Sequence, residues 1–88
     1  MADIITLEGI EIEVENPQEE DRNAERRMTS YLIKGVREYS GMSRPEFADW
    51  LGIPYRTLQE WELGRRQMPD YVLRLIAYKV ATEKKKKR

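Results

Sequence analysis

The sequence predicts a mainly α-helical protein, a small bundle of four to five helices with a β-hairpin arm at its N-terminal end. From Met28 onward, apolar residues recur at helical spacing, and Gly, Pro and capping residues mark where one helix ends and the next begins. Between Ile10 and Glu15, by contrast, apolar and acidic residues alternate, which is typical of a strand with one buried face. The chain has 88 residues, of which 40% are hydrophobic, and this leaves room for one small domain.

The composition excludes several classes of function. The chain contains no cysteine and no histidine. A disulfide framework, a Cys or His zinc site, a Ser-His triad and a Cys nucleophile are therefore excluded. A hydrolase built on paired carboxylates would survive this test, but no such pair can be placed on an apolar cleft. We therefore expect no enzyme, no metal and no cofactor.

The sequence also gives no sign of a membrane or of export. It lacks a run of about 18 apolar residues, and its first residues lack the basic start of a secretion signal. We therefore expect a cytoplasmic protein without a membrane partner.

The net charge of zero conceals a marked division of charge along the chain. Residues 1–27 carry 9 acidic and 3 basic side chains, whereas residues 28–88 carry 7 acidic and 13 basic ones. The two parts should favour different partners. We divide the chain into an acidic arm with its linker at 1–21, a helical domain at 22–83, and a basic tail at 84–88 that we interpret as a solubilising end.

The acidic arm has the pattern of a hairpin. The run from Ile4 to Leu7 precedes the alternating segment across Glu8-Gly9, a dipeptide compatible with a tight turn. A two-stranded hairpin is marginal in isolation, so this one needs a surface on which to lie. The predicted inner face consists of Ile10, Ile12 and Val14, and the outer face of Glu11, Glu13 and Glu15.

Five further segments follow, four of them with helix signals. Residues 17–27 contain a single apolar residue, so we interpret them as a linker or a frayed helix. The next helix begins near Met28 and ends at Gly41. Ser43 and Glu46 form a capping box with Pro45 in the first turn, which predicts a helix from Arg44 to Gly52. Its apolar residues and those of the preceding helix are Met28, Leu32, Ile33, Val36, Tyr39, Phe47 and Leu51.

Two more helices complete the domain. One runs from about Pro54 to Leu63 and is closed by Gly64. The last opens at Pro69-Asp70, and its apolar residues are Val72, Leu73, Leu75, Ile76 and Val80.

The two short helices joined across Gly52-Ile53 have the arrangement of a helix-turn-helix. Ala48 is small where the second helix must cross closely, and Phe47, Leu51, Ile53, Leu58 and Trp61 can fill the core between the helices. The segment from Arg44 to Leu63 resembles the helix-turn-helix of the phage repressor, Cro and Xre family. The resemblance extends from Ile33 to about Ile76 and is carried by Ala48, Gly52, Leu58, Trp61-Glu62 and Gly64.

The helix from Pro54 to Leu63 has two distinct faces. At about 100° per residue, Leu58 and Trp61 fall on the core face. On the opposite face, Arg suits guanine, Gln suits adenine, Glu can accept from cytosine N4, and Tyr can contact a thymine methyl group or a phosphate. The resemblance implies the same positions for base contact, with Thr57 near a phosphate. The predicted base-contacting residues are Tyr55, Arg56, Gln59 and Glu60.

Other charged residues are predicted to contact the DNA backbone or to form an ion pair that stabilises the fold. Arg44, Arg65 and Arg66 are placed to contact phosphates. Glu60 would be repelled by phosphates unless it meets a cytosine or pairs with Arg56. The resemblance pairs Glu62 with Arg37 in a partly buried ion pair.

Trp50 occupies a place that is usually polar and exposed in the resembled family. An aromatic side chain there suggests cover from the hairpin, the last helix or a second subunit. We expect the hairpin arm to dock on the domain or its twin near Trp50, with its carboxylates held away from the DNA surface.

The predicted function is a sequence-specific double-stranded DNA-binding transcriptional regulator. The resemblance implies a dimeric repressor that reads an inverted repeat with the helix at 54–63 in the major groove. The alternative is an antitoxin, whose acidic arm from Ile4 to Glu15 would bind a basic toxin by β-augmentation while the helix-turn-helix autoregulates the operon.

Overall fold

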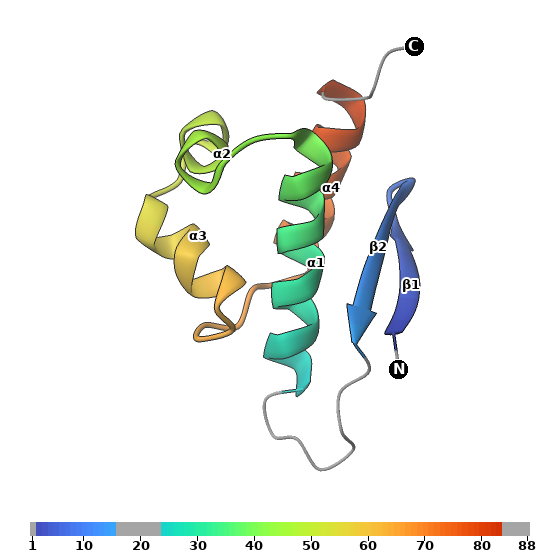
Figure 1. The fold of residues 1–88 in the computed structure, drawn as a ribbon. Coiled ribbons are helices and arrows are strands. Elements are labelled where there is room, and N and C mark those ends of the chain that lie inside the picture. Colours follow the sequence, from blue (N-terminus) through green and yellow to red (C-terminus); the bar gives the residue numbers. More distant parts are fainter. Residues whose placement is uncertain (1, 16–23, 84–88) are drawn as a thin grey trace.

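The computed structural model describes residues 2–15 and 24–83 and arranges them in three layers. The helices α1 and α4 lie side by side in the middle, α2 and α3 lie on one side of them, and the hairpin lies on the other (Figure 1). The predicted fold class, mainly α with an N-terminal hairpin, is confirmed. The elements are β1 (Ala2–Leu7), β2 (Ile10–Glu15), α1 (Ala24–Ser40), α2 (Arg44–Leu51), α3 (Tyr55–Glu62) and α4 (Asp70–Glu83).

The hairpin has the register that the alternation predicts. β1 and β2 are antiparallel, and Ile5 lies opposite Ile12. Glu8 and Gly9 both have positive φ angles, 52° and 87°, as a two-residue type I′ turn requires. The predicted inner face of β2 is buried, and Glu11 and Glu13 point outward.

The hairpin packs against α1 at a glycine. A Cβ atom at Gly35 would overlap the side chain of Ile12, so β2 can approach the helix only because this position has no side chain. The side chains of Ile10, Ile12 and Val14 join the main hydrophobic core. The arm therefore docks on the domain, as expected, and contributes to its core.

The boundaries of α1 differ in part from the prediction. The helix begins at Ala24, four residues before the first apolar residue of its stripe, so residues 24–27 are helical, which agrees with the second of the two interpretations of residues 17–27. It ends before Gly41, which adopts a φ of 79° as predicted. The remainder of the predicted linker and the basic tail at 84–88 lie outside the described residues.

The helix-turn-helix forms through local hydrogen bonds. The Ser43 side chain accepts a hydrogen bond from the Glu46 N–H, and the Glu46 carboxylate accepts one from the Ser43 N–H at 2.9 Å. The bond from the Ser43 N–H to the ionised carboxylate, and after it a hydrogen bond from the Ser43 side chain, lowers the pKa of Glu46. Gly52 ends α2 with a φ of 75°, and α3 starts directly after Pro54. Both predicted boundaries are confirmed.

The last helix buries a narrower face than its apolar content suggested. Leu73, Ile76 and Val80 are buried, but Leu75 is 64% exposed because it lies about 200° around the helix from Leu73. Met68, in the loop before α4, is 1% exposed and fills the core instead. No helix in the described ranges is long and apolar enough to cross a membrane.

Trp50 is covered by the last helix, so the expected contact with the hairpin is wrong. The Lys79 Nζ lies 4.6 Å from the centre of the Trp50 ring, and the Phe47 ring stacks against it at 6.0 Å. The hairpin packs on the far side of α1 and α4 from α2 (Figure 1). Because Gly35 already provides a close-fitting site on α1, the arm does not extend to α2.

Candidate nucleic-acid interface

The outward face of α3 carries the four side chains predicted to contact bases. Leu58 and Trp61 are buried toward α1, and α3 itself lies at the outer side of the bundle (Figure 1). On the opposite face Tyr55 is 44% exposed and Arg56 is exposed, while Gln59 and Glu60 are partly exposed. Thr57 is also partly exposed. The structure therefore places these groups together on one accessible helix face.

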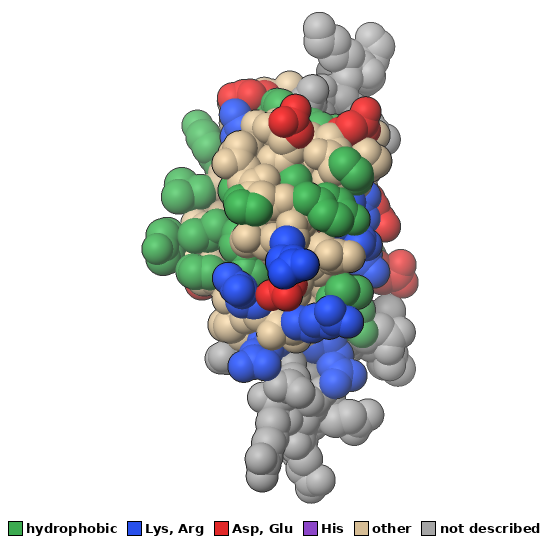
Figure 2. All heavy atoms as spheres, turned by 90° about the vertical axis from the view of Figure 1, so that its left-hand side faces the viewer, with side chains coloured by type: hydrophobic (Ala, Val, Ile, Leu, Met, Phe, Trp, Pro, Cys, Tyr) green, Lys and Arg blue, Asp and Glu red, His purple; other side chains and the backbone are tan. Residues whose placement is uncertain are grey.

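Basic side chains surround this face. Figure 2 shows Lys and Arg side chains gathered on the lower half of the side that carries α2 and α3, with an acidic group among them. Arg56 projects from α3, and Arg65 and Arg66 project from the loop that follows; all three are exposed. We call Arg56, Arg65 and Arg66, together with two arginines of α1, the basic face.

The two arginines of α1 were missed by sequence reasoning. Arg26 and Arg27 are exposed in the first turns of α1. A Cβ atom at Gly64 would lie 3.9 Å from the Arg26 carbonyl oxygen, and Arg27 lines a small hollow with Leu63 and Gly64. This segment was assigned to the acidic part of the chain, and only the packing of α1 against the loop after α3 adds its charge to the basic face.

Glu60 is paired within this region. Its Oε1 lies 3.4 Å from the Nε of Arg66. The sequence spacing suggested Arg56 as the partner, but the loop after α3 brings Arg66 to the carboxylate instead. The pair is partly exposed, so it holds the two side chains together only weakly. It partly neutralises the charge of Glu60 within the basic face.

Glu62 fixes the orientation of α3 through two arginines. Its side chain is fully buried, and Arg37 of α1 bonds both carboxylate oxygens, with Nε 2.7 Å from Oε2 and Nη2 3.2 Å from Oε1. The Arg37 Nη1 also donates to the Met42 carbonyl oxygen at 3.1 Å. The ion pair expected from the resemblance is therefore present. It ties the end of α3 to α1 and to the loop before α2.

Arg44 is the second cation on Glu62, which the sequence did not indicate. Its Nε lies 3.1 Å from the Glu62 Oε1, and its side chain is 28% exposed. The predicted role of Arg44 was a phosphate contact only. In the structure its stem is held by Glu62, so any phosphate contact would use the outer nitrogens of the guanidinium group. Two guanidinium groups thus share one carboxylate beside the first turn of α2.

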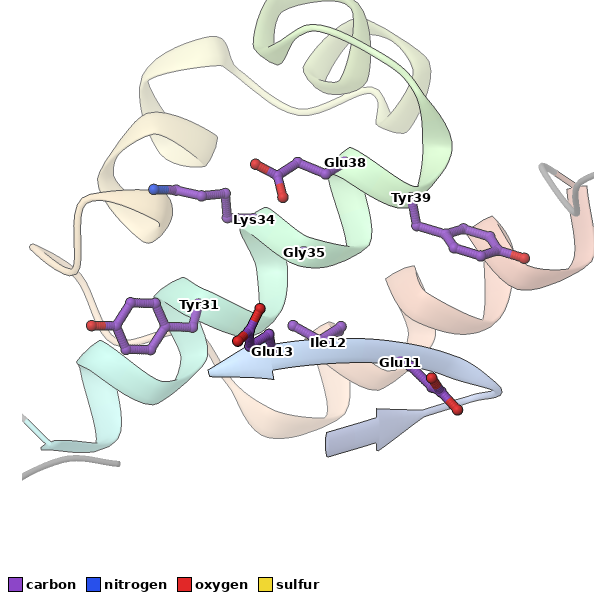
Figure 3. A pocket seen from close by; sticks show the side chains of 8 residues that line it. All are labelled: Glu11, Ile12, Glu13, Tyr31, Lys34, Gly35, Glu38 and Tyr39. Carbon is purple, nitrogen blue, oxygen red and sulfur yellow. The ribbon is translucent and has the colours of Figure 1, made fainter. Parts of the chain in front are cut away.

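A group of three acidic side chains lies beside the hairpin, on the other side of the molecule. A hollow of about 400 Å³ lies between β2 and α1, where Tyr31 and Tyr39 project on either side of Gly35 (Figure 3). Glu38 and Lys34 of α1 also line it. The other acidic residues at this hollow are Glu11 and Glu13 of β2.

Both regions present charged and polar groups at the surface. No group of three His, Cys, Asp or Glu side chains that could hold a metal ion occurs among residues 2–15 and 24–83. The basic face offers guanidinium, amide and phenol groups, and the hairpin side offers carboxylates. The molecule is therefore polarised, with donors for an anionic partner on the α3 side and acceptors for a cationic one on the hairpin side.

No protein-family model, no curated protein and no solved structure matches this chain.

Proposed function

We propose that this chain is a sequence-specific double-stranded DNA-binding transcriptional regulator, acting as a dimeric repressor that reads an inverted repeat with α3 in the major groove. The observation that supports this most strongly is the arrangement of Tyr55, Arg56 and Gln59 on one open helix face with arginines around it. β2 lies on the other side of α1 from α3 (Figure 1), and Glu11 and Glu13 are exposed there, so they would not repel the DNA backbone. A repressor of this kind acts in the cytoplasm.

Each side chain of α3 has a role suited to its chemistry. Arg56 would bond guanine O6 and N7 with its two parallel donors, and Gln59 would bond adenine N6 and N7. Tyr55 would contact a thymine methyl group or a phosphate, and Glu60 would accept from cytosine N4. These contacts would distinguish one DNA sequence from another.

A second set of residues would hold the DNA backbone. Thr57, Arg44, Arg65 and Arg66 were expected to do so from the sequence, and Arg26 and Arg27 extend this set along α1. Backbone contacts fix the register of a protein on the duplex and carry no sequence information of their own.

Selection from a random duplex pool, followed by affinity measurements at several salt concentrations, tests the proposal. With about five phosphate contacts, the logarithm of the binding constant should fall with that of the salt concentration with a slope near −4.5. An unenriched pool together with an affinity that does not change with salt would contradict DNA binding.

Substitutions of Arg56 separate base reading from charge. Arg56→Ala should cost about 1–3 kcal/mol at one base pair of the selected site. Arg56→Lys keeps the charge but loses the paired donors, so it should lose discrimination at the same base pair. Arg65→Ala serves as the comparison and should weaken binding to all sequences alike. Unchanged discrimination in Arg56→Ala would show that another face of the protein reads the DNA.

The acidic side of the hairpin supports a second candidate function, that of an antitoxin. Glu11 and Glu13 are exposed on β2, and the two-stranded sheet has no third strand within the described residues. A basic toxin could add a strand here while α3 remains open to DNA. The test is co-expression with a small basic protein encoded beside this chain. Neutralisation of its toxicity that is lost in Glu11→Lys would support an antitoxin, and the absence of such a neighbouring gene would count against it.

A further inference from the structure

An apolar stripe runs along the outer face of α4. Tyr71, Leu75 and Tyr78 are 68%, 64% and 58% exposed. They are four and three residues apart and therefore follow one another on the same side of the helix. The opposite side of α4 packs into the core, so these three residues have no role in the core of the domain. A group of large exposed apolar side chains of this kind on a small protein is often an interaction site.

Groups of opposite charge flank the stripe. Arg74 and Glu8, at the tip of the hairpin, line one shallow hollow together with the three apolar residues. Arg74 also pairs with Asp70 at 3.0 Å, but both side chains are largely exposed, so this pair is weak. Across a two-fold axis every contact occurs twice with the two copies exchanged, so a contact of Arg74 with Glu8 of the partner would be formed in two places. The stripe and its flanking charges can thus pair with the same surface of a second copy.

The stripe also lies where a second copy would not obstruct α3. Figure 2 shows hydrophobic side chains along the left edge of the side that carries α2 and α3, the edge on which α4 lies. A second copy placed against this edge would leave α3 of both copies uncovered. The molecule measures 29 and 21 Å across its two shorter directions, a scale on which paired copies can reach successive major grooves, about 34 Å apart.

We propose that the α4 stripe is the face on which a second copy of this chain docks, and that the pair so formed is the unit that reads an inverted repeat. This inference rests on the proposed function and names its partner surface. The three side chains expose on the order of 400 Å² in total. A standard interface uses about 800 Å² from each partner. The two copies therefore associate weakly in solution and pair on the DNA, where the half-sites hold them at high effective concentration.

The test compares one half-site with the full inverted repeat, both taken from the selected pool, for wild type and two variants of α4. Leu75→Gln makes the stripe polar at an exposed position, and Leu75→Met is the matched control that keeps it apolar. We expect Leu75→Gln to bind the inverted repeat about tenfold more weakly and to bind the half-site as wild type does. Leu75→Met should behave as wild type on both duplexes. An inverted-repeat affinity of Leu75→Gln equal to that of wild type would overturn the dimer face and leave DNA binding standing.

A charge exchange tests the two-fold arrangement. Glu8→Arg and Arg74→Glu should each weaken pairing on the inverted repeat, because each places like charges across the axis. The double variant should restore it. Restoration is not expected from a loss of folding, so it excludes damage to the hairpin or to α4. Because Glu8 and Arg74 also line one hollow of the same copy, single variants that melt at the wild-type temperature are needed to assign the contact to the pair of copies. A double variant as weak as the two single ones would contradict the arrangement.

Sedimentation equilibrium of the protein alone separates the two proposals. A concentration-dependent dimer that Leu75→Gln abolishes would support the face even if no DNA sequence were selected, in which case the proposed function fails by itself. A chain that remains monomeric at high concentration and binds the inverted repeat as independent single copies would overturn the inference. The stripe would then be a site for a protein of different sequence.

Discussion

At the scale of single residues, the ion network around Glu62 links the fold to the proposed function. One buried carboxylate receives donors from Arg37 and Arg44, so three helices converge on a single side chain. A buried charge is tolerated only when it is paired and hydrogen-bonded, and both oxygens of Glu62 are engaged. The orientation of α3 therefore depends on this residue more directly than on the exposed pair of Glu60 and Arg66.

Removal of the Glu62 carboxylate should destabilise the domain strongly. Glu62→Ala leaves Arg37 and Arg44 facing each other without a counter-charge, and loss of one partner from a buried pair costs about 3–5 kcal/mol. Glu60→Ala is the matched control, since its pair is partly exposed and should contribute about 0–1 kcal/mol. Urea unfolding measures both. Similar losses of unfolding free energy in the two variants would show that the buried network does not hold α3.

At the scale of elements, the hairpin and α1 meet through a glycine in the middle of a helix. Gly35 carries a cost in helix propensity of about 1 kcal/mol relative to Ala. The close approach of Ile12 explains why the residue is needed there, because a methyl group would occupy the same space. The packing of β2 on α1 therefore requires a glycine at a position where helix propensity alone would favour another residue.

Gly35→Ala should destabilise the protein, although alanine has a higher helix propensity than glycine. The substitution favours the isolated helix, yet it should lower the unfolding free energy because β2 must move away from α1. The double variant with Ile12→Ala should lose less than the two single losses combined, since the smaller side chain leaves room for the methyl group. Thermal melts of the four proteins provide the measurement. A more stable Gly35→Ala variant would indicate that the hairpin does not rest on this position.

The cap of α2 predicts a dependence of stability on pH. Hydrogen bonds from the backbone and side chain of Ser43 lower the pKa of Glu46 below its ordinary value of 4.5. The resulting stabilisation is present above that value and is lost as the pH falls through the lowered pKa. Glu46→Gln should remove this part of the acid sensitivity, which unfolding at a series of pH values would reveal. An unaltered pH profile in the variant would assign acid unfolding to other carboxylates.

At the scale of the whole molecule, the acidic side chains of β2 and the basic face lie on opposite sides of the α1 and α4 layer. The hairpin carries Glu11 and Glu13 outward, and its inner face completes the core. One segment therefore serves two purposes: it supplies apolar side chains to a small domain, and it keeps negative charge away from α3. The arm and the helical domain, distinct by sequence composition, share a single hydrophobic core.

Deletion of residues 1–21 should unfold the protein or reduce its stability severely. The three inner side chains of β2 are each expected to contribute about 1.5–3 kcal/mol through burial, which is comparable in sum to the total stability of a small domain, about 5–15 kcal/mol. The double variant Glu11→Gln and Glu13→Gln removes the outward charge and should melt near wild type. Circular dichroism during heating measures both. A truncated chain that melts at the wild-type temperature would make the hairpin dispensable for folding.

The sequence by itself determined the elements and their faces. The capping box at Ser43, the glycine at 52 and the alternation from Ile10 each act through residues within about four positions, so their effects can be predicted without knowledge of the rest of the chain. The separation of Leu58 and Trp61 from the outward face of α3 follows from helical geometry in the same way.

The tertiary structure alone decided which surfaces meet. Arg26 and Arg27 join the basic face because α1 packs beside the loop after α3, and Arg44 turns to Glu62 because α2 and α3 bring the two residues together from 18 positions apart. Trp50 lies against Lys79 and not against the hairpin because Gly35 already receives β2 on the other side of α1. Such contacts depend on how whole helices and strands pack, whereas the spacing of residues along the chain reflects only interactions between residues close in sequence.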